Sequence, residues 1–203
     1  MLLTFVIAST LLSFAPGPDN IFVLMQSALH GPRAGIFITL GLCTGLLVHT
    51  TLVALGVAAV IMMSATAFLV LKLIGAAYLV YLAVLALRAS AAVIGREKSP
   101  PLSAGQYYLR GILMNLSNPK VAIFFLAFLP QFARPEAGAL TLQLVVLGGL
   151  FIVVALVVFS LIAVLAGRLA SALTGSPRAQ ILLNRLAALV FFGLAARLAV
   201  SSR

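Results

Sequence analysis

Two stretches of this chain, Ala15-Pro16-Gly17-Pro18-Asp19-Asn20 and Asn115-Leu116-Ser117-Asn118-Pro119-Lys120, place a proline directly before a charged residue inside apolar sequence. The first continues as Ile21-Phe22-Val23-Leu24 and the second as Val121-Ala122-Ile123-Phe124-Phe125. A charge at the centre of a bilayer costs about 2.5–3.5 kcal/mol on insertion scales, so membrane helices keep one mainly where it pairs or functions. The two matching contexts therefore predict that Asp19 and Lys120 belong to one central site.

The composition is that of an integral membrane protein. Of its 203 residues, 64% are hydrophobic and 8% are charged, and the mean hydropathy is +1.25, whereas soluble proteins have about a quarter charged residues. The formal net charge of +10 comes from Lys and Arg residues between apolar runs, where such residues set orientation, so no nucleic-acid partner is expected. Cys43 is the only cysteine, which excludes an intramolecular disulfide.

Six apolar stretches predict an all-α membrane protein with six transmembrane helices, because each crossing of the bilayer takes about 20 residues. The stretches cover roughly residues 2–29, 34–62, 66–88, 107–130, 140–166 and 181–200. The first is too long for one straight crossing and contains two prolines, so we expect two half-helices around a break at residues 16–18. A second break is expected at Pro119 in the fourth helix.

A polar segment from Ala89 to Gln106 divides the chain into two sets of three helices. We therefore predict one transporter domain over residues 1–203, with repeat one at about 1–88, a cytoplasmic loop at about 89–106 and repeat two at about 107–203. Duplication of an odd number of crossings inverts the second copy, so the two repeats should be related by a pseudo-two-fold axis in the membrane plane. Asp19 and Lys120 would then both lie near mid-depth, about 15 Å before the end of their helices.

The basic residues predict that both termini face outward. Cytoplasmic loops are enriched in Lys and Arg, and the connections between helices 1 and 2, 3 and 4, and 5 and 6 hold most of them. These residues are Arg33, Arg88, Arg96, Lys98, Arg110, Arg168, Arg178 and Arg185, against Arg134, Arg197 and Arg203 on the opposite side.

Asp19 has three candidate roles, which are compatible with one another. It could be the counter-ion of Lys120, a proton carrier, or the ligand of a substrate ammonium group. Exchange of a proton for a cationic group at one carboxylate would couple the two fluxes. Lys120 could neutralise Asp19 in the empty site or bind a substrate carboxylate. The structural alternative is a static ion pair that fixes helix packing.

The proline breaks offer further polar groups. Pro16 and Pro18 lack amide donors and leave carbonyls of the preceding turn unpaired, and such carbonyls can bind an ammonium group. Gly17 lies between these prolines, and the following half-helix presents free amides and a dipole that favour a carboxylate. Polar side chains near the two breaks, Asn20, Asn115 and Asn118, with the second break at Pro119, complete a predicted site suited to a zwitterion.

Two further residues have both structural and functional interpretations. His49 follows Gly41 and Gly45 at four-residue spacing, which permits close helix contact, so His49 is expected either to hydrogen-bond across a helix interface or to serve as a proton relay or substrate contact. Lys72 lies near a helix start, where an anchoring role is favoured over a gating role.

These motifs together resemble the LysE/RhtB family of amino-acid exporters over nearly the whole chain. The resemblance lies in residues 16–20, in Gly41, Gly45 and His49, in residues 72–88, and in Gly111 through Phe132 with Asn118-Pro119-Lys120. It implies six helices and export of amino acids or their derivatives from the cytoplasm, driven by proton exchange. A multi-pass protein of the bacterial inner membrane is therefore expected, with an amino acid, protons and the lipid bilayer as partners; a homodimer is left open.

Because Asp19 is the only deep acid, a neutral or small amino acid is the favoured substrate. The alternative within the wider superfamily is an exporter of a metal or other inorganic cation, which should show several deep carboxylates, histidines or cysteines in one plane. A non-transporting scaffold would leave the two charges unexplained. An intramembrane enzyme would need a catalytic constellation, and the sequence offers no second acid or Ser/His pair. We therefore expect no enzyme, no cofactor and no bound metal.

Overall fold

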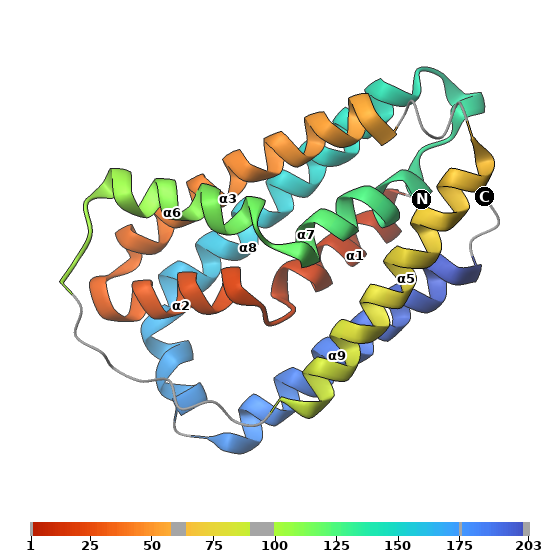
Figure 1. Ribbon diagram of the computed structural model, residues 1–203. Coiled ribbons are helices and arrows are strands. Elements are labelled where there is room, and N and C mark those ends of the chain that lie inside the picture. The colour runs from red at the N-terminus through yellow and green to blue at the C-terminus, as the bar shows by residue number, and fades with distance from the viewer. Residues whose placement is uncertain (1, 58–63, 90–99, 175, 201–203) are drawn as a thin grey trace.

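A computed structural model describes residues 2–57, 64–89, 100–174 and 176–200, and every regular element in these ranges is helical (Figure 1). The first half contains α1 (Leu2–Phe14), α2 (Pro18–His30), α3 (Pro32–Leu52), the π-helix η1 (Val53–Val57) and α5 (Ala65–Arg88). The second half contains α6 (Ala104–Leu116), α7 (Pro119–Ile123), the π-helix η2 (Phe124–Phe128), the 3₁₀ helices η3 (Leu129–Phe132) and η4 (Pro135–Ala137), α8 (Leu140–Thr174) and α9 (Pro177–Val200).

Local sequence accounts for several helix ends. Gly31, with φ of 87°, separates α2 from α3, and Pro32 then begins α3 at a position where its missing N–H is no loss. Ser64 caps α5, since its hydroxyl accepts from the backbone N–H of Ala67 at 3.1 Å. Ser103 and Gln106 form a reciprocal capping box at the start of α6.

The helices are long and apolar enough for a multi-pass membrane protein, as the composition predicted. Four are single candidate spans, namely Pro32–Gly56, Thr66–Arg88, Leu140–Ala170 and Arg178–Val200. Two helix pairs bend at a short interruption, Leu2–Phe14 with Pro18–His30 by 58° and Ala104–Leu116 with Pro119–Phe132 by 52°, so the described chain holds four spans, or six if each bent pair is one span.

The six expected stretches correspond to these helices and pairs. α8 extends beyond the expected end at 166, because the residues after it are mostly good helix formers. The end of the second stretch, residues 58–62, and most of the expected cytoplasmic loop, residues 90–99, lie outside the described residues.

The apolar surface fits a lipid environment. α8, for example, exposes Val153, Val157, Leu161 and Val164 along its length, and such a stripe has no favourable contact with water.

α3 packs against α2, α6 and α8. α1 and α2 both contact α8, and α5 pairs with α9 at the side of the bundle (Figure 1). The bends between α1 and α2 and between α6 and α7 lie close to one another, since Lys120 near the start of α7 bonds the carbonyls of Leu12 and Ala15 at the end of α1.

Candidate functional site

The break between α1 and α2 leaves carbonyl groups without their helical partners. In an α-helix the carbonyl of residue i accepts from the N–H of residue i+4, and Pro16 has no N–H to give to Leu12. Gly17 then takes an extended conformation, with φ of −170° and ψ of 176°, and serves as the N-cap of α2. The last turn of α1 therefore presents carbonyl oxygens that other groups of the protein must satisfy.

Lys120, from the second break, satisfies two of these carbonyls. Its ammonium nitrogen Nζ donates to the carbonyl of Ala15 at 3.0 Å and to that of Leu12 at 3.4 Å. It also donates to Oδ1 of Asn20 at 3.5 Å. The side chain is almost fully buried, so a lysine near the start of α7 neutralises the carboxyl end of α1 inside the bundle.

Two asparagines hold this arrangement in place. The side-chain amide of Asn20 donates to the carbonyl of Ser13 at 2.5 Å, which directs its oxygen toward Lys120. Asn118 is the N-cap of α7, and its Oδ1 accepts from the backbone N–H of Lys120 at 3.0 Å. The position of the ammonium group is thus fixed by both helix breaks.

Asp19 is buried beside the oxygens that surround the ammonium group of Lys120, and its side chain is 1% exposed. The amide side chains of Asn115 and Asn118 are its neighbours, and Lys120 and His49 lie within electrostatic range. In the described part of the chain, no hydrogen bond or close ion pair joins Asp19 to Lys120, whose ammonium instead contacts Asn20 and backbone carbonyls.

Three buried polar atoms in this cluster make no hydrogen bond of ordinary length and angle among the described residues, although the amides of Asn115 and Asn118 lie near the carboxylate of Asp19. They are Oδ1 of Asp19, Oδ1 of Asn115 and Nδ2 of Asn118. Buried polar groups are nearly always paired, so an unpaired set in one place calls for an explanation. Two acceptors and one donor complement a ligand that brings an ammonium group and a carboxylate.

His49 connects α3 to the same cluster. Its Nε2 lies 3.3 Å from the backbone carbonyl of Asn115, and its ring faces Phe125 at 5.8 Å between centroids. A Cβ atom on Gly45 would lie only 2.6 Å from Oδ1 of Asn115, so glycine is needed where α3 meets α6. This is the cross-helix contact expected for His49, and its role in proton transfer or substrate contact stays a prediction.

The predicted residues near the two breaks come together in the structure. Lys72 is buried on α5. Pro16 and Gly17 lie between α1 and α2, Pro18 begins α2, and Pro119 begins α7. Sequence reasoning missed the carbonyls of Leu12 and Ala15 as the partners of Lys120, although the proline four residues after Leu12 was the signal for one of them.

Sequence reasoning also missed a column of phenylalanine rings that adjoins the site. Phe124 contacts Phe128 and Phe151 with centroids 4.9 and 5.1 Å apart, and Phe128 contacts Phe132 at 5.2 Å. The guanidinium of Arg197 lies over the ring of Phe132, 4.5 Å from its centroid. The column reaches α1, where Phe5 contacts Phe132 with ring centroids 5.0 Å apart. The signal for the column was the four-residue spacing of Phe124, Phe128 and Phe132.

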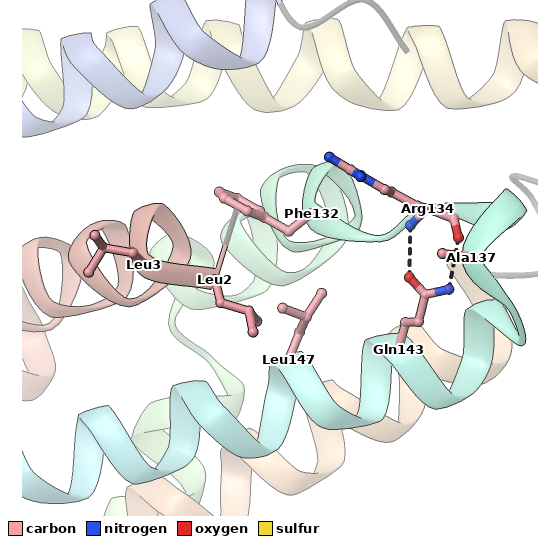
Figure 2. Close-up of a pocket in the computed structure, with 7 residues that line it drawn as sticks. All are labelled: Leu2, Leu3, Phe132, Arg134, Ala137, Gln143 and Leu147. Atoms are coloured by element: carbon pink, nitrogen blue, oxygen red, sulfur yellow. Dashed lines mark hydrogen bonds between the residues drawn. The ribbon is translucent and has the colours of Figure 1, made fainter.

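Two of the hollows among the described residues lie outside the polar cluster. Figure 2 shows one of about 560 Å³ beside the start of α1, where Gln143 bonds the backbone N–H and carbonyl of Arg134 at 2.8 Å each. The other, of about 640 Å³, lies between α1 and α9 and extends from Pro16 to Arg197. Its lining is mostly apolar, and it reaches Ala15, whose carbonyl holds Lys120.

Known proteins resemble this chain over most of its length. The chain is 38% identical over 181 residues to a protein of Salmonella typhimurium named homoserine/homoserine lactone efflux protein, covering 89% of this chain and 87% of that protein. It is 28% identical over 198 residues to a protein of Salmonella choleraesuis named leucine efflux protein, covering 97% and 93%. It is 31% identical over 167 residues to the uncharacterized membrane protein YrhP of Bacillus subtilis, covering 78% and 79%. No solved structure matches it significantly.

The sequence model of LysE type translocators matches residues 10–202. That match includes the Pro16 to Asn20 break, His49 and the Asn118 to Lys120 break, the same residues that build the buried polar cluster. Together with the apolar helices, the match identifies a multi-pass membrane protein of the bacterial inner membrane, and the chain belongs to the LysE type translocator family.

Proposed function

We propose that this protein exports neutral or small amino acids, or their derivatives, from the cytoplasm in exchange for protons, with Asp19 and Lys120 at the central site. The observation that carries the proposal is the set of unpaired buried atoms, Oδ1 of Asp19, Oδ1 of Asn115 and Nδ2 of Asn118. The names of relatives support it, since two of them are efflux proteins for homoserine or its lactone and for leucine.

In this proposal the substrate ammonium binds between the oxygens of Asp19 and Asn115. The substrate carboxylate accepts from Nδ2 of Asn118 and lies near the amino-terminal ends of α2 and α7, whose dipoles favour a negative group. The substrate side chain then meets no second carboxylate, because Asp19 is the only buried acid among the described residues. A neutral side chain meets no charge that it must compensate.

Proton coupling follows from competition at one carboxylate. The charged form of Asp19 holds the substrate ammonium, and a proton that arrives from outside displaces it, because the neutral acid binds a cation weakly. The protein would bind substrate from the cytoplasm and a proton from the other side, with both termini outward. No further coupling group is required.

The proposed architecture is two inverted repeats with broken first helices, and the order of elements supports it. Each half has a bent pair followed by two long helices, and the corresponding helices α3 and α8 contact each other, as do α5 and α9. An experimental structure should superpose the two halves after rotation about an in-plane axis. Two halves that run in the same direction would contradict the proposal.

Counterflow of radiolabelled amino acids into proteoliposomes tests the function. We expect exchange of homoserine, threonine or leucine by the parental protein, and stimulated export when a pH gradient is imposed. Asp19→Asn keeps the size of the side chain but removes its charge, so we expect loss of substrate exchange and of proton-driven export. Glu136→Gln is the matched control, since Glu136 is exposed on η4, and it should retain the parental rate.

Two results would contradict the proposal. One is the absence of exchange across a full amino-acid panel with correctly inserted, folded protein. The other is parental export by Asp19→Asn, which would make the buried acid a packing residue.

A further inference from the structure

We propose that Lys120 is a built-in cation of the transport site, which fills an ammonium subsite and so restricts the substrate to amino acids that bring a single ammonium group. This inference rests on the proposed amino-acid export and specifies its substrate class. The ammonium group of Lys120 takes the position that a second ammonium group of a substrate, such as that of a basic side chain, would otherwise take.

The subsite is made of three oxygens that face one ammonium nitrogen. These are the carbonyls of Ala15 and Leu12, at 3.0 and 3.4 Å, and Oδ1 of Asn20, at 3.5 Å. An ammonium group has three donors and no acceptor, so the three oxygens match it in number and kind. Pro16 creates the subsite because it leaves the Leu12 carbonyl without a helical donor.

The surroundings are shaped around this nitrogen. A Cβ atom at Gly17 would lie 2.9 Å from Nζ of Lys120 and 3.4 Å from its Cε, so a side chain at this position would push the ammonium group away from its present place. Asn20 is oriented by its bond to the carbonyl of Ser13, which leaves its oxygen for the cation. The three oxygens of the subsite are therefore held in place, and the ammonium group of Lys120 is bound among them.

A substrate meets a different acceptor. Oδ1 of Asp19 and Oδ1 of Asn115 stay without a hydrogen-bond partner in the described chain while Lys120 occupies the carbonyls. One substrate ammonium can bind there. A second one, on the side chain of a basic amino acid, would need the carbonyl subsite or another buried carboxylate, and the described residues provide only Asp19 as a buried acid.

A simple structural cap is the competing interpretation, in which Lys120 only ties α7 to α1. The two interpretations differ when the tethered ammonium is replaced by a free one. A cavity left by Lys120→Ala should accept methylammonium, because the three oxygens remain. Lys120→Met fills the same space with an apolar chain and should exclude it, so it is the matched control.

The assay is amino-acid counterflow in proteoliposomes at equal pH on both sides, because methylamine would collapse a pH gradient. Methylammonium chloride is compared with tetramethylammonium chloride at the same concentration, since the latter has the charge but no N–H donor. We expect Lys120→Ala to lower the rate of neutral amino-acid exchange by about tenfold or more, because charge-assisted hydrogen bonds are lost. Methylammonium should then raise the rate of this variant several-fold. Lys120→Met should be equally impaired in both salts.

Substrate range is the second measurement. Without methylammonium, Lys120→Ala should exchange diamino acids of graded length, such as 2,4-diaminobutyrate, ornithine and lysine, faster than the parental protein does. Equal inactivity of folded Lys120→Ala in both salts, rescue by tetramethylammonium, or no gain for any diamino acid would overturn the inference.

Folded yield keeps the test decisive if Lys120→Ala is unstable. Methylammonium should raise the monodisperse yield and the melting temperature of Lys120→Ala but not those of Lys120→Met, and equal failure in both salts would count against the subsite. The failure of the proposed function looks different. If the proposed function is wrong, the parental protein exchanges no amino acid. The effect of methylammonium on the melting temperature of Lys120→Ala can still be measured, and it tests the subsite separately.

Discussion

Replacement of Gly41 by alanine tests the helix contact that positions the site. A Cβ atom at Gly41 would lie 2.0 Å from the backbone carbonyl oxygen of Tyr108 and 3.0 Å from the Cα of Gly111. The shorter distance is about 1.4 Å less than the 3.4 Å at which ordinary contact begins. Both neighbours are backbone atoms and cannot rotate away, so α3 and α6 must separate.

The expected loss of stability follows from two opposed effects. Overpacking of a close interface costs about 1–3 kcal/mol, and we take the upper end because the backbone cannot yield locally. The better helix propensity of alanine returns up to about 1 kcal/mol. The net cost of about 2 kcal/mol should lower the melting temperature by about 4–8 °C in a chain of this length.

The chain carries its own reporter for this measurement. Cys43 is the only cysteine, it is half-buried, and it lies two residues after Gly41 on α3. A maleimide dye that fluoresces on thiol reaction therefore reports the unfolding of this helix in detergent. Loss of the monodisperse peak after heating supplies a second measure that does not depend on the thiol.

Gly149→Ala is the matched control. A Cβ atom at Gly149 on α8 meets nothing within 4 Å, so its melting temperature should be unchanged or raised by a few degrees, about the helix-propensity gain. The packing argument is refuted if Gly41→Ala melts with the parental protein, or if Gly149→Ala loses as much stability as Gly41→Ala does.

Two further predictions concern orientation and the aromatic column. In a Cys43→Ser background, Gly105→Cys should be shielded from an impermeant thiol reagent in intact cells while Ala139→Cys is labelled, because the basic loops are expected on the cytoplasmic side. Labelling of both positions to the same extent would contradict this orientation. Arg197→Gln removes the cation over Phe132 and should cost about 0.5–1 kcal/mol of stability in the thiol assay; an unchanged melting temperature would show that this contact contributes nothing.

Much of the fold was predictable because its signals are local. Apolar stretches of about 20 residues predict spans regardless of their partners, and the structure has candidate spans or bent pairs in all six places. The glycine spacing of Gly41, Gly45 and His49 predicted a close helix contact, and the structure has it between α3 and α6. Side chains that share one helix face follow from periodicity alone.

The partners within the site were harder to predict because they depend on distances between elements far apart in sequence. Asp19 and Lys120 could be assigned to one region from matching contexts, but the choice between a carboxylate and a carbonyl as partner of the ammonium depends on where Nζ reaches. The bond to the Ala15 carbonyl joins residues 105 positions apart. No local pattern gives that distance, although Pro16 identifies the Leu12 carbonyl as available.

The separate placement of the two charges bears on the proposed transport mechanism. If the ammonium of Lys120 were bound directly to the carboxylate of Asp19, an incoming substrate would have to break a buried ion pair and leave an uncompensated charge, which costs several kcal/mol. Instead the ammonium is held by backbone carbonyls and Asn20, while it still lies within electrostatic range of Asp19. The lysine can thus lower the cost of burying the carboxylate and still leave its oxygen unoccupied, so the proposed substrate binding and proton exchange at Asp19 would not require Lys120 to move.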